Sequence, residues 1–244
     1  MLLLENRHKG DIVVAIISFV LTEVFAALFF LNKAVGNPDF NIIFKTIASV
    51  FFVLTPTFAY KKKPCDKKYF LLIMFGLFFS LFGDVLLAIK GWDLGFSLGV
   101  VTFTLAQIFF VVAFSYLERY KHIDLVIFGG LSIFLVLLEN INKDFDYDGK
   151  YIFILIYSIV ISYMVSKAFS LFRIKKGNEK AVIFTTIAMV LFFLSDLDLL
   201  FVYFYKTKYV ALSYANIVLY YMAQGILGLS FINPIKKLDK NSNI

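Results

Sequence analysis

Long apolar runs alternate with short charged connections along the whole chain. A helix that crosses a bilayer needs ~20 predominantly apolar residues. Eight runs meet this length, at about residues 12–31, 40–59, 69–89, 95–117, 123–139, 151–172, 181–205 and 209–232. The pattern therefore predicts an all-α polytopic membrane protein with eight transmembrane helices, which form a single integral membrane domain over residues 1–244.

The composition agrees with this architecture and excludes several kinds of site. Of the 244 residues, 61% are hydrophobic and only 17% are charged, so eight spans leave almost no chain for a soluble domain. Cys65 is the only cysteine, which excludes an internal disulfide and a cysteine-rich metal site. The two histidines, His8 and His122, lie in polar connections. We therefore expect no metal and no cofactor.

Lysine and arginine residues are distributed unequally between the two sides of the predicted bundle. One set of connections and span ends carries 17 of them and the opposite set carries 6. Because short cytoplasmic loops carry the excess of basic residues, both termini are predicted to be cytoplasmic, and we expect a multi-pass protein of the cell membrane. This topology also accounts for the net charge of +7 without a nucleic-acid partner. A homo-oligomer remains open.

Four ionisable residues, Glu23, Lys45, Asp84 and Asp196, lie well inside apolar runs. Such residues cost roughly 2.5–3.5 kcal/mol on insertion scales, which makes them candidates for a functional site. Both aspartates follow the last lysine of the preceding connection by 16 residues, a helical rise of ~24 Å. Lys45 lies at a similar depth of ~21 Å when counted on its own helix. We therefore expect the lysine and the two aspartates to share one layer of the membrane.

Two interpretations of this layer are possible. Lys45 could form a buried ion pair with either aspartate that only sets the register of the helices. Against this, two carboxylates and one lysine leave a net negative charge, which favours one acid that retains its proton. Glu23, at ~18 Å by the same count, could join the group or bond to a neighbouring helix.

A short sequence repeat relates the two halves of the chain. The segment Ser80 to Leu87, which contains Asp84, is followed by Gln107 on the next predicted span. Asp196 is likewise followed by Gln224 on the span after its own. Spans three and four thus resemble spans seven and eight. The pattern allows two parallel four-helix repeats, with the two aspartates facing each other across an axis along the membrane normal.

At these segments the chain resembles the YhhN family of multi-pass membrane proteins, which includes the animal lysoplasmalogenases. The resemblance covers residues 40–232 and consists of Phe44-Lys45, Gly83-Asp84, residues 192–196 and residues 220–224. It implies hydrolysis of the vinyl-ether bond of a lysoplasmalogen, which releases a fatty aldehyde and glycerophosphocholine or glycerophosphoethanolamine. Family members commonly carry a histidine, and a tyrosine three residues later, where this chain has Gln107 and Phe110.

The residues agree with this chemistry. A vinyl ether is cleaved by protonation of its outer carbon and capture of the resulting oxocarbenium ion by water, which requires an acid and a carboxylate. We predict that Asp84 and Asp196 are this catalytic pair, with carboxyl groups roughly 5–9 Å apart by analogy with glycoside hydrolysis. Substrate-binding candidates are Lys45, Glu23, Tyr220, Gln107 and Gln224.

The predicted partners are a lysophospholipid substrate and membrane lipid. Gln107 and Gln224 come out well below the carboxylates, so we expect them to line the cavity or to hold helices together. Phenylalanines of spans three, four, seven and eight would surround the hydrocarbon chain. The alternative function is a non-enzymatic transporter or lipid-binding protein, in which the same acids bind a proton or a cation.

Overall fold

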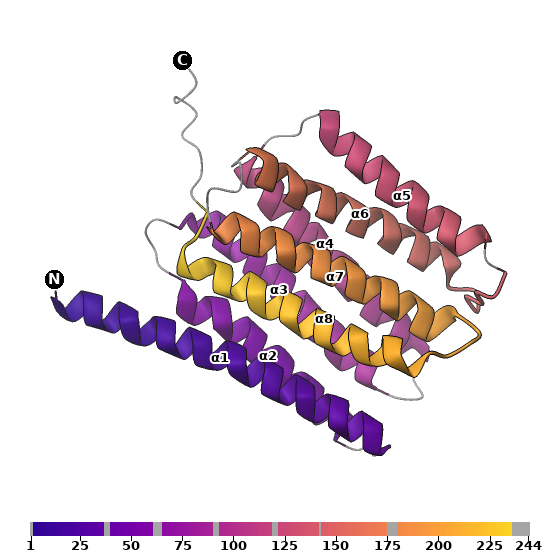
Figure 1. The fold of residues 1–244 in the computed structure, drawn as a ribbon, viewed down its shortest axis with the longest axis horizontal. Helices are drawn as coiled ribbons and strands as arrows, with labels where there is room; N and C mark the ends of the chain where they lie inside the picture. Colours follow the sequence, from indigo (N-terminus) through magenta and orange to yellow (C-terminus); the bar gives the residue numbers. More distant parts are fainter. Residues whose placement is uncertain are drawn as a thin grey trace.

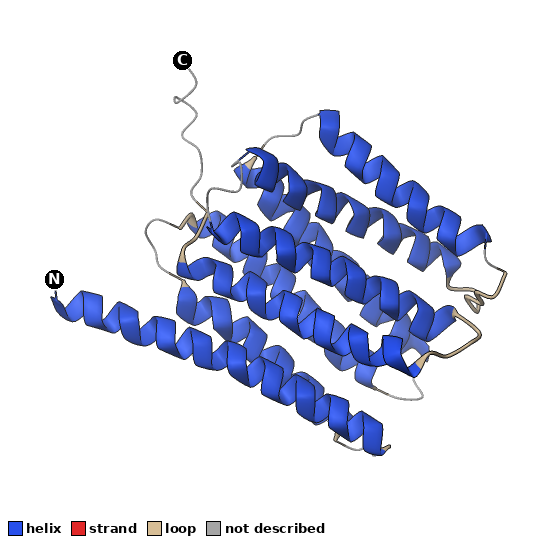
Figure 2. Ribbon diagram, in the orientation of Figure 1, coloured by secondary structure: helices blue, strands red, loops and turns tan. Residues whose placement is uncertain are grey.

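The computed structural model describes residues 2–36, 40–60, 65–89, 93–118, 122–141, 143–174 and 180–235. Within these residues the chain forms a bundle of eight long helices (Figures 1 and 2). The helices are α1 (Leu2–Val35), α2 (Asn41–Ala59), α3 (Lys67–Ala88), α4 (Asp93–Leu117), α5 (His122–Ile141), α6 (Tyr151–Ile174), α7 (Lys180–Phe204) and α8 (Val210–Leu229), followed by a short 3₁₀ helix, Ser230–Ile232.

The predicted eight-span fold is confirmed. All eight helices are long enough and apolar enough to cross a membrane. Helix α1 extends beyond the first predicted span, residues 12–31, because it has 34 residues. At that length α1 is about 50 Å long, more than the ~30 Å hydrocarbon core, and the helix continues through charged residues at which an apolar run stops. Its first turns extend beyond the neighbouring helices (Figure 1).

Local sequence signals determine where α3 begins and how it pairs with α4. Asp66 is the N-cap of α3, and its Oδ1 accepts hydrogen bonds from the backbone N–H groups of Lys68 and Tyr69. Such a cap satisfies donors that the first helical turn leaves without intrahelical partners. The other oxygen of Asp66 accepts a hydrogen bond of 2.9 Å from the hydroxyl of Tyr116 on α4. This contact joins the start of α3 to the end of α4.

The helices pack in a pattern that agrees with the predicted repeat. The contacts α1 with α2, α2 with α3 and α3 with α4 correspond to α5 with α6, α6 with α7 and α7 with α8. The contact between α2 and α8 corresponds in the same way to that between α6 and α4. Each helix is thus matched by the helix four positions later, as in two parallel repeats about an axis along the membrane normal.

The two halves differ at their outer helices. Among the described residues, α1 packs against both α2 and α8, whereas α5 packs against α6 without a comparable contact to α4. Figure 1 shows α5 at the edge of the bundle. The buried carboxylate of Asp124 on α5 binds Arg173 of α6 at 2.5 Å, which fastens one end of this outer helix.

Helices α2, α4, α6 and α8 all begin at the same end of the bundle, which we call the site end.

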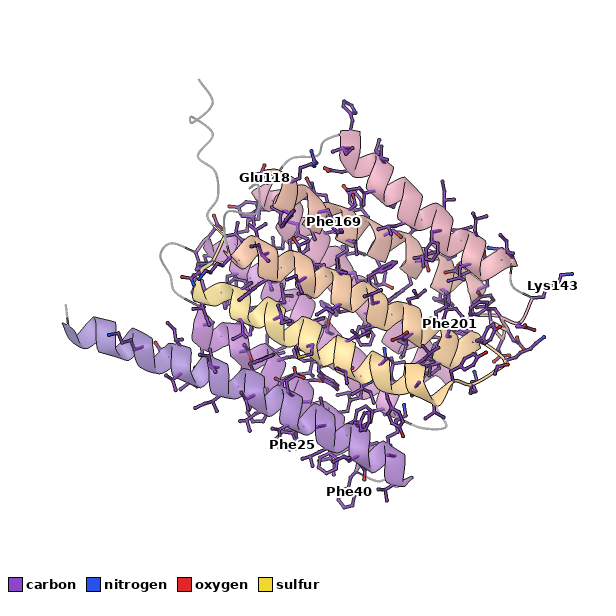
Figure 3. The ribbon with its side chains drawn as sticks, in the orientation of Figure 1. Phe25, Phe40, Glu118, Lys143, Phe169 and Phe201 are labelled. Atoms are coloured by element: carbon purple, nitrogen blue, oxygen red, sulfur yellow. The ribbon has the colours of Figure 1, made fainter. Side chains whose placement is uncertain are left out.

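Aromatic side chains lie between the helices (Figure 3). Glycines, among them Gly83 and Gly99, allow α3 and α4 to approach closely. A Cβ placed on Gly83 would lie 2.6 Å from ring atoms of Phe103. A Cβ on Gly99 of α4 would lie 2.7 Å from the side chain of Leu87. Both contacts are too short for a methyl group, so a larger residue at either position would require the neighbouring side chain to move. They lie next to Asp84, close to the candidate site.

Candidate functional site

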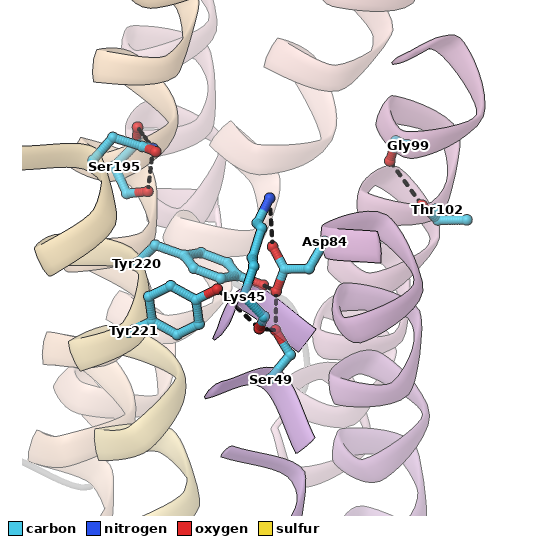
Figure 4. Close-up of polar contacts among 9 residues, drawn as sticks. Lys45, Ser49, Asp84, Gly99, Thr102, Ser195, Tyr220 and Tyr221 are labelled. Carbon is cyan, nitrogen blue, oxygen red and sulfur yellow. Dashed lines mark hydrogen bonds and ion pairs between the residues drawn. The ribbon is translucent and has the colours of Figure 1, made fainter. Parts of the chain in front are cut away.

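Asp84 is the centre of a cluster built from α2, α3 and α8 (Figure 4). Its side chain is fully buried, and its Oδ1 lies 3.2 Å from Nζ of Lys45. Its Oδ2 accepts hydrogen bonds from the hydroxyl of Ser49 at 2.6 Å and from the hydroxyl of Tyr220 at 2.7 Å. A buried carboxylate is tolerated when a cation and hydrogen-bond donors surround it, as they do here.

Asp196 has a different environment, built from α4, α6 and α7. Its Oδ2 accepts a hydrogen bond of 2.5 Å from the hydroxyl of Tyr157 and one of 3.3 Å from the amide of Gln107. Both donors are neutral. Within the described part of the chain no lysine or arginine forms a salt bridge with Asp196. The two acids therefore differ in one respect above all, since among the described residues a cation pairs with Asp84 and none pairs with Asp196.

The repeat relates these two clusters to each other. The separation in sequence between Asp84 and Asp196 equals that between Lys45 and Tyr157. The helices correspond as well, because the partners of Asp84 lie on α2 and α8 and those of Asp196 lie on α6 and α4. One half thus carries a lysine where the other half carries a tyrosine, and each of these side chains contacts the aspartate of its own half.

Both aspartates line one cavity of about 210 Å³ near the site end of the bundle. Lys45 and Tyr220 also form part of its wall. The other polar residues that line it are Lys33, Asn41, Ser195, Ser213, Asn216, Tyr203 and Tyr221. We call this space the polar cavity. It brings together the lysine and the two acids that depth along the helices predicted to share a layer.

A second cavity, of about 60 Å³, lies beside the first and is called the apolar cavity below. The two share the wall residues Leu87, Phe103, Leu199, Tyr203 and Asp196, so Asp196 lies where polar and apolar surfaces meet. Three further phenylalanines, Phe96, Phe193 and Phe204, come from α4 and α7. Helices α5 and α6 also supply wall residues, whereas α8 supplies none. The reason is that α6 packs between α4 and α7.

The predicted depth of Gln107 was wrong, because its amide reaches Asp196 instead of lying well below it. Side chains on a helix tilt toward its N-terminus. Gln107 on α4 therefore tilts toward the site end, while Asp196 on the oppositely directed α7 tilts away from it, and the two meet. The tyrosine of the family pattern is replaced by Phe110, which is fully buried against Gly76 and outside the walls of both cavities.

Glu23 and Gln224 do not join the site. Neither contributes to the wall of the polar or the apolar cavity. Gln224 is fully buried, and its side-chain atoms have no described hydrogen-bond partner. Oε1 of Glu23 is also without a described partner and lies near Gly225 of α8. Glu23 thus belongs to the packing of α1 against α8, which the repeat does not reproduce on the other half.

Several residues of the site were not singled out from the sequence. Ser49 lies one helical turn after Lys45, so their shared face of α2 was a usable signal. Tyr157 could have been found from the spacing of the two aspartates, which places it opposite Lys45 in the repeat. Lys33 was counted only as a connection lysine, although it lines the polar cavity.

The sequence also has a recognisable family relationship. The model of the YhhN family matches residues 40–231, a range that contains α2 to α8 and both acids of the polar cavity. No curated protein and no solved structure matches the chain. The matched range leaves out α1. Since the match covers more than half of the 244 residues, the chain belongs to the YhhN family.

Proposed function

We propose that this protein hydrolyses the vinyl-ether bond of lysoplasmalogens, with Asp84 and Asp196 as the catalytic pair. One observation carries the proposal: two carboxyl groups face the same cavity, and only one of them is paired with a cation. General acid–base chemistry needs two groups in different protonation states, and unlike surroundings provide them. The family relationship supports the same reaction class.

The surroundings also suggest which role each acid takes. The ion pair with Lys45 favours the charged form of Asp84, which makes Asp84 the carboxylate that steadies a cation and accepts a proton from water. Asp196 has neutral partners on Oδ2, and Oδ1 has no described hydrogen bond. We therefore assign Asp196 as the acid that donates the proton.

The reaction then proceeds in three balanced steps. Asp196 transfers its proton to the outer carbon of the double bond, whose π electrons form the new C–H bond and leave an oxocarbenium ion. Water adds to the carbon bonded to the ether oxygen and loses a proton to Asp84, which gives a hemiacetal. The hydroxyl group of the hemiacetal gives up its proton, the bond between its carbon and the glycerol oxygen breaks, and the glycerol oxygen takes up one proton, so that aldehyde and alcohol separate. The proton that Asp84 accepted then returns, directly or through a water molecule, to Asp196, so both acids regain their starting states and one water is consumed per turnover.

The two cavities fit the two chemical parts of such a substrate. The apolar cavity would take the hydrocarbon segment next to the double bond, and the polar cavity would take the glycerol part. Asp196 lies at their junction, where the ether bond would be placed. Lys45 forms an ion pair with Asp84, so its role is to keep that carboxylate in its charged form.

The test is an aldehyde assay on purified protein in detergent with a lysoplasmalogen. Wild-type protein should release free aldehyde without any ion gradient. Asp84→Asn and Asp196→Asn should each lower turnover by at least ~10², the usual contribution of a positioned acid or base. Asp198→Asn is the matched control, since Asp198 lies on the same helix but in neither cavity wall.

The outcomes separate the proposal from its alternative. A transporter or lipid-binding protein would release no aldehyde from any variant, and that result would overturn the proposed reaction. Near-normal turnover of Asp84→Asn or Asp196→Asn would overturn the catalytic role of that residue. Size-exclusion profiles like that of wild-type protein would show that a loss of activity does not come from misfolding.

A further inference from the structure

Lys33 is a cation of the polar cavity that the proposed reaction does not use. It lies two residues before the end of α1 and lines the cavity together with Lys45. Its Nζ donates a hydrogen bond to the hydroxyl oxygen of Ser213 on α8. Within the described residues Lys33 forms no salt bridge, so its charge is not balanced by a carboxylate. Lys45, in contrast, is paired with Asp84.

The neighbours of Lys33 leave further hydrogen-bond donors in the same part of the cavity. The oxygen of Ser213 accepts from Lys33, so its own O–H hydrogen remains available. The amide oxygen of Asn41 accepts a hydrogen bond of 2.6 Å from Asn32, which leaves the NH₂ group of Asn41 as a donor. Ammonium, hydroxyl and amide donors thus come from α1, α8 and α2.

This combination of groups selects an anion with several acceptor oxygens. An ammonium group without a carboxylate partner attracts negative charge, and hydrogen bonds to charged groups are stronger than neutral ones. A tetrahedral oxyanion can accept from donors on three helices at once, which a single hydroxyl group cannot do. Lys33, Asn41 and Ser213 line the polar cavity but not the apolar one, so they lie away from the hydrocarbon part of the site.

We propose that Lys33, Asn41 and Ser213 form a phosphate subsite that holds the headgroup phosphate of the lysolipid. The inference rests on the proposed function, because it assigns the residues of that site that hold the phosphate and so discriminate against neutral alkenylglycerols. In the lysolipid the ether bond lies between the phosphate and the hydrocarbon chain. The site would match this order, with the acids between the phosphate subsite and the apolar cavity. Lys33 precedes residues 40–231, so the subsite is completed by a helix outside the matched part of the chain.

Binding of lipids that the protein cannot cleave tests this subsite separately from catalysis. The probes are a saturated 1-O-alkyl lysophosphocholine and the matching 1-O-alkylglycerol, titrated into purified full-length protein in detergent. Lys33→Met should weaken binding of the phosphate lipid by about tenfold, the value of one charge-assisted hydrogen bond, and leave binding of the alkylglycerol unchanged. Lys33→Arg should retain most of the affinity, because the charge remains.

Lys143→Met is the control, since Lys143 is exposed in a loop at the site end and lines neither cavity (Figure 3). It should bind both probes like wild-type protein. If Lys33→Met weakened the binding of both probes equally, or of neither, the proposed subsite would be overturned.

Inorganic phosphate is a third probe. If it displaced the lysolipid at equal concentration, the anion site would stand, but the lipid headgroup would be overturned as its occupant. If the protein bound the phosphate lipid in preference to the alkylglycerol but released no aldehyde, the subsite would stand and the proposed hydrolysis would be rejected.

Discussion

Lys45 and Tyr157 occupy equivalent positions of the repeat, yet they stabilise their aspartates in different ways. The ammonium of Lys45 balances the charge of Asp84, whereas the hydroxyl of Tyr157 offers Asp196 only a neutral hydrogen bond. Removal of a cation from a buried pair leaves an uncompensated charge, while removal of a neutral donor costs one hydrogen bond. The two substitutions should therefore have unequal effects on stability.

Lys45→Met is expected to lower the free energy of unfolding by about 3–5 kcal/mol, as found when one partner of a buried ion pair is removed. Tyr157→Phe should lower it by only about 1–2 kcal/mol. Thermal unfolding in detergent measures both. The double variant Lys45→Met, Asp84→Asn should recover most of the loss, because the unpaired charge is gone. Equal melting temperatures for the two single variants would contradict the ion pair.

The contact between α3 and α4 depends on glycine at position 83, next to Asp84. A methyl group there would meet the ring of Phe103, which lines both cavities and packs edge-on against Tyr220. Overpacking of this kind costs about 1–3 kcal/mol and moves neighbouring side chains. A change in the packing of α3 against α4 should therefore displace the Phe103 ring and alter the walls of both cavities.

Gly83→Ala should lower both the melting temperature and the rate of aldehyde release, because Phe103, which lines both cavities, must move. The matched control is Gly130→Ala on α5, where an added Cβ meets no atom within 4 Å. That variant should be neutral or stabilised by about 0.5–1 kcal/mol, since alanine suits a helix better than glycine. Equal effects of the two substitutions would show that the close approach of α3 and α4 is unimportant.

The helices were predictable because apolar length alone decides whether a segment can cross a bilayer. The association of Lys45 with an aspartate was also accessible, since charged groups inside a membrane need partners. Tyr157 attracts no attention by itself, because a tyrosine in an apolar run carries no charge that requires explanation, and only the spacing of the two aspartates places it at the position equivalent to Lys45. The predicted depth of Gln107 in the membrane was wrong. The rise per residue gives the depth of a Cα atom, whereas the hydrogen bond to Asp196 depends on the direction of the side chain. The mismatch between α1 and α5 left no pattern in the sequence.

The orientation of the bundle follows from its basic residues and remains a prediction. Reporter fusions after residue 65 and after Ile244 should read as cytoplasmic, and a fusion after Asp146 should read as external. If the first two fusions gave opposite locations, an odd number of spans would separate them. The expected result would place the polar cavity toward the outer surface, since it lies near the site end.

Cysteine labelling provides a second measurement of the same orientation. Cys65 is buried, and burial together with Asp66 raises the pKa of its thiol to about 12. Only the thiolate reacts with maleimides, so its reactive fraction at pH 8 is on the order of 10⁻⁴, and reactivity should rise only as the pH approaches that pKa. A single introduced cysteine, Asp148→Cys, should therefore react with an impermeant maleimide from outside without removal of Cys65.

The difference between Lys45 and Tyr157 also bears on how such a site can arise. Two identical four-helix chains, assembled about a two-fold axis, would give equivalent residues identical surroundings. Both acids would then contact the same type of residue, and a mutation in the gene would change the surroundings of both acids at once. With the halves joined in one gene, the two members of each repeat-related pair can diverge independently. A fused pair of repeats thus permits two unlike acids to face one cavity within a single chain.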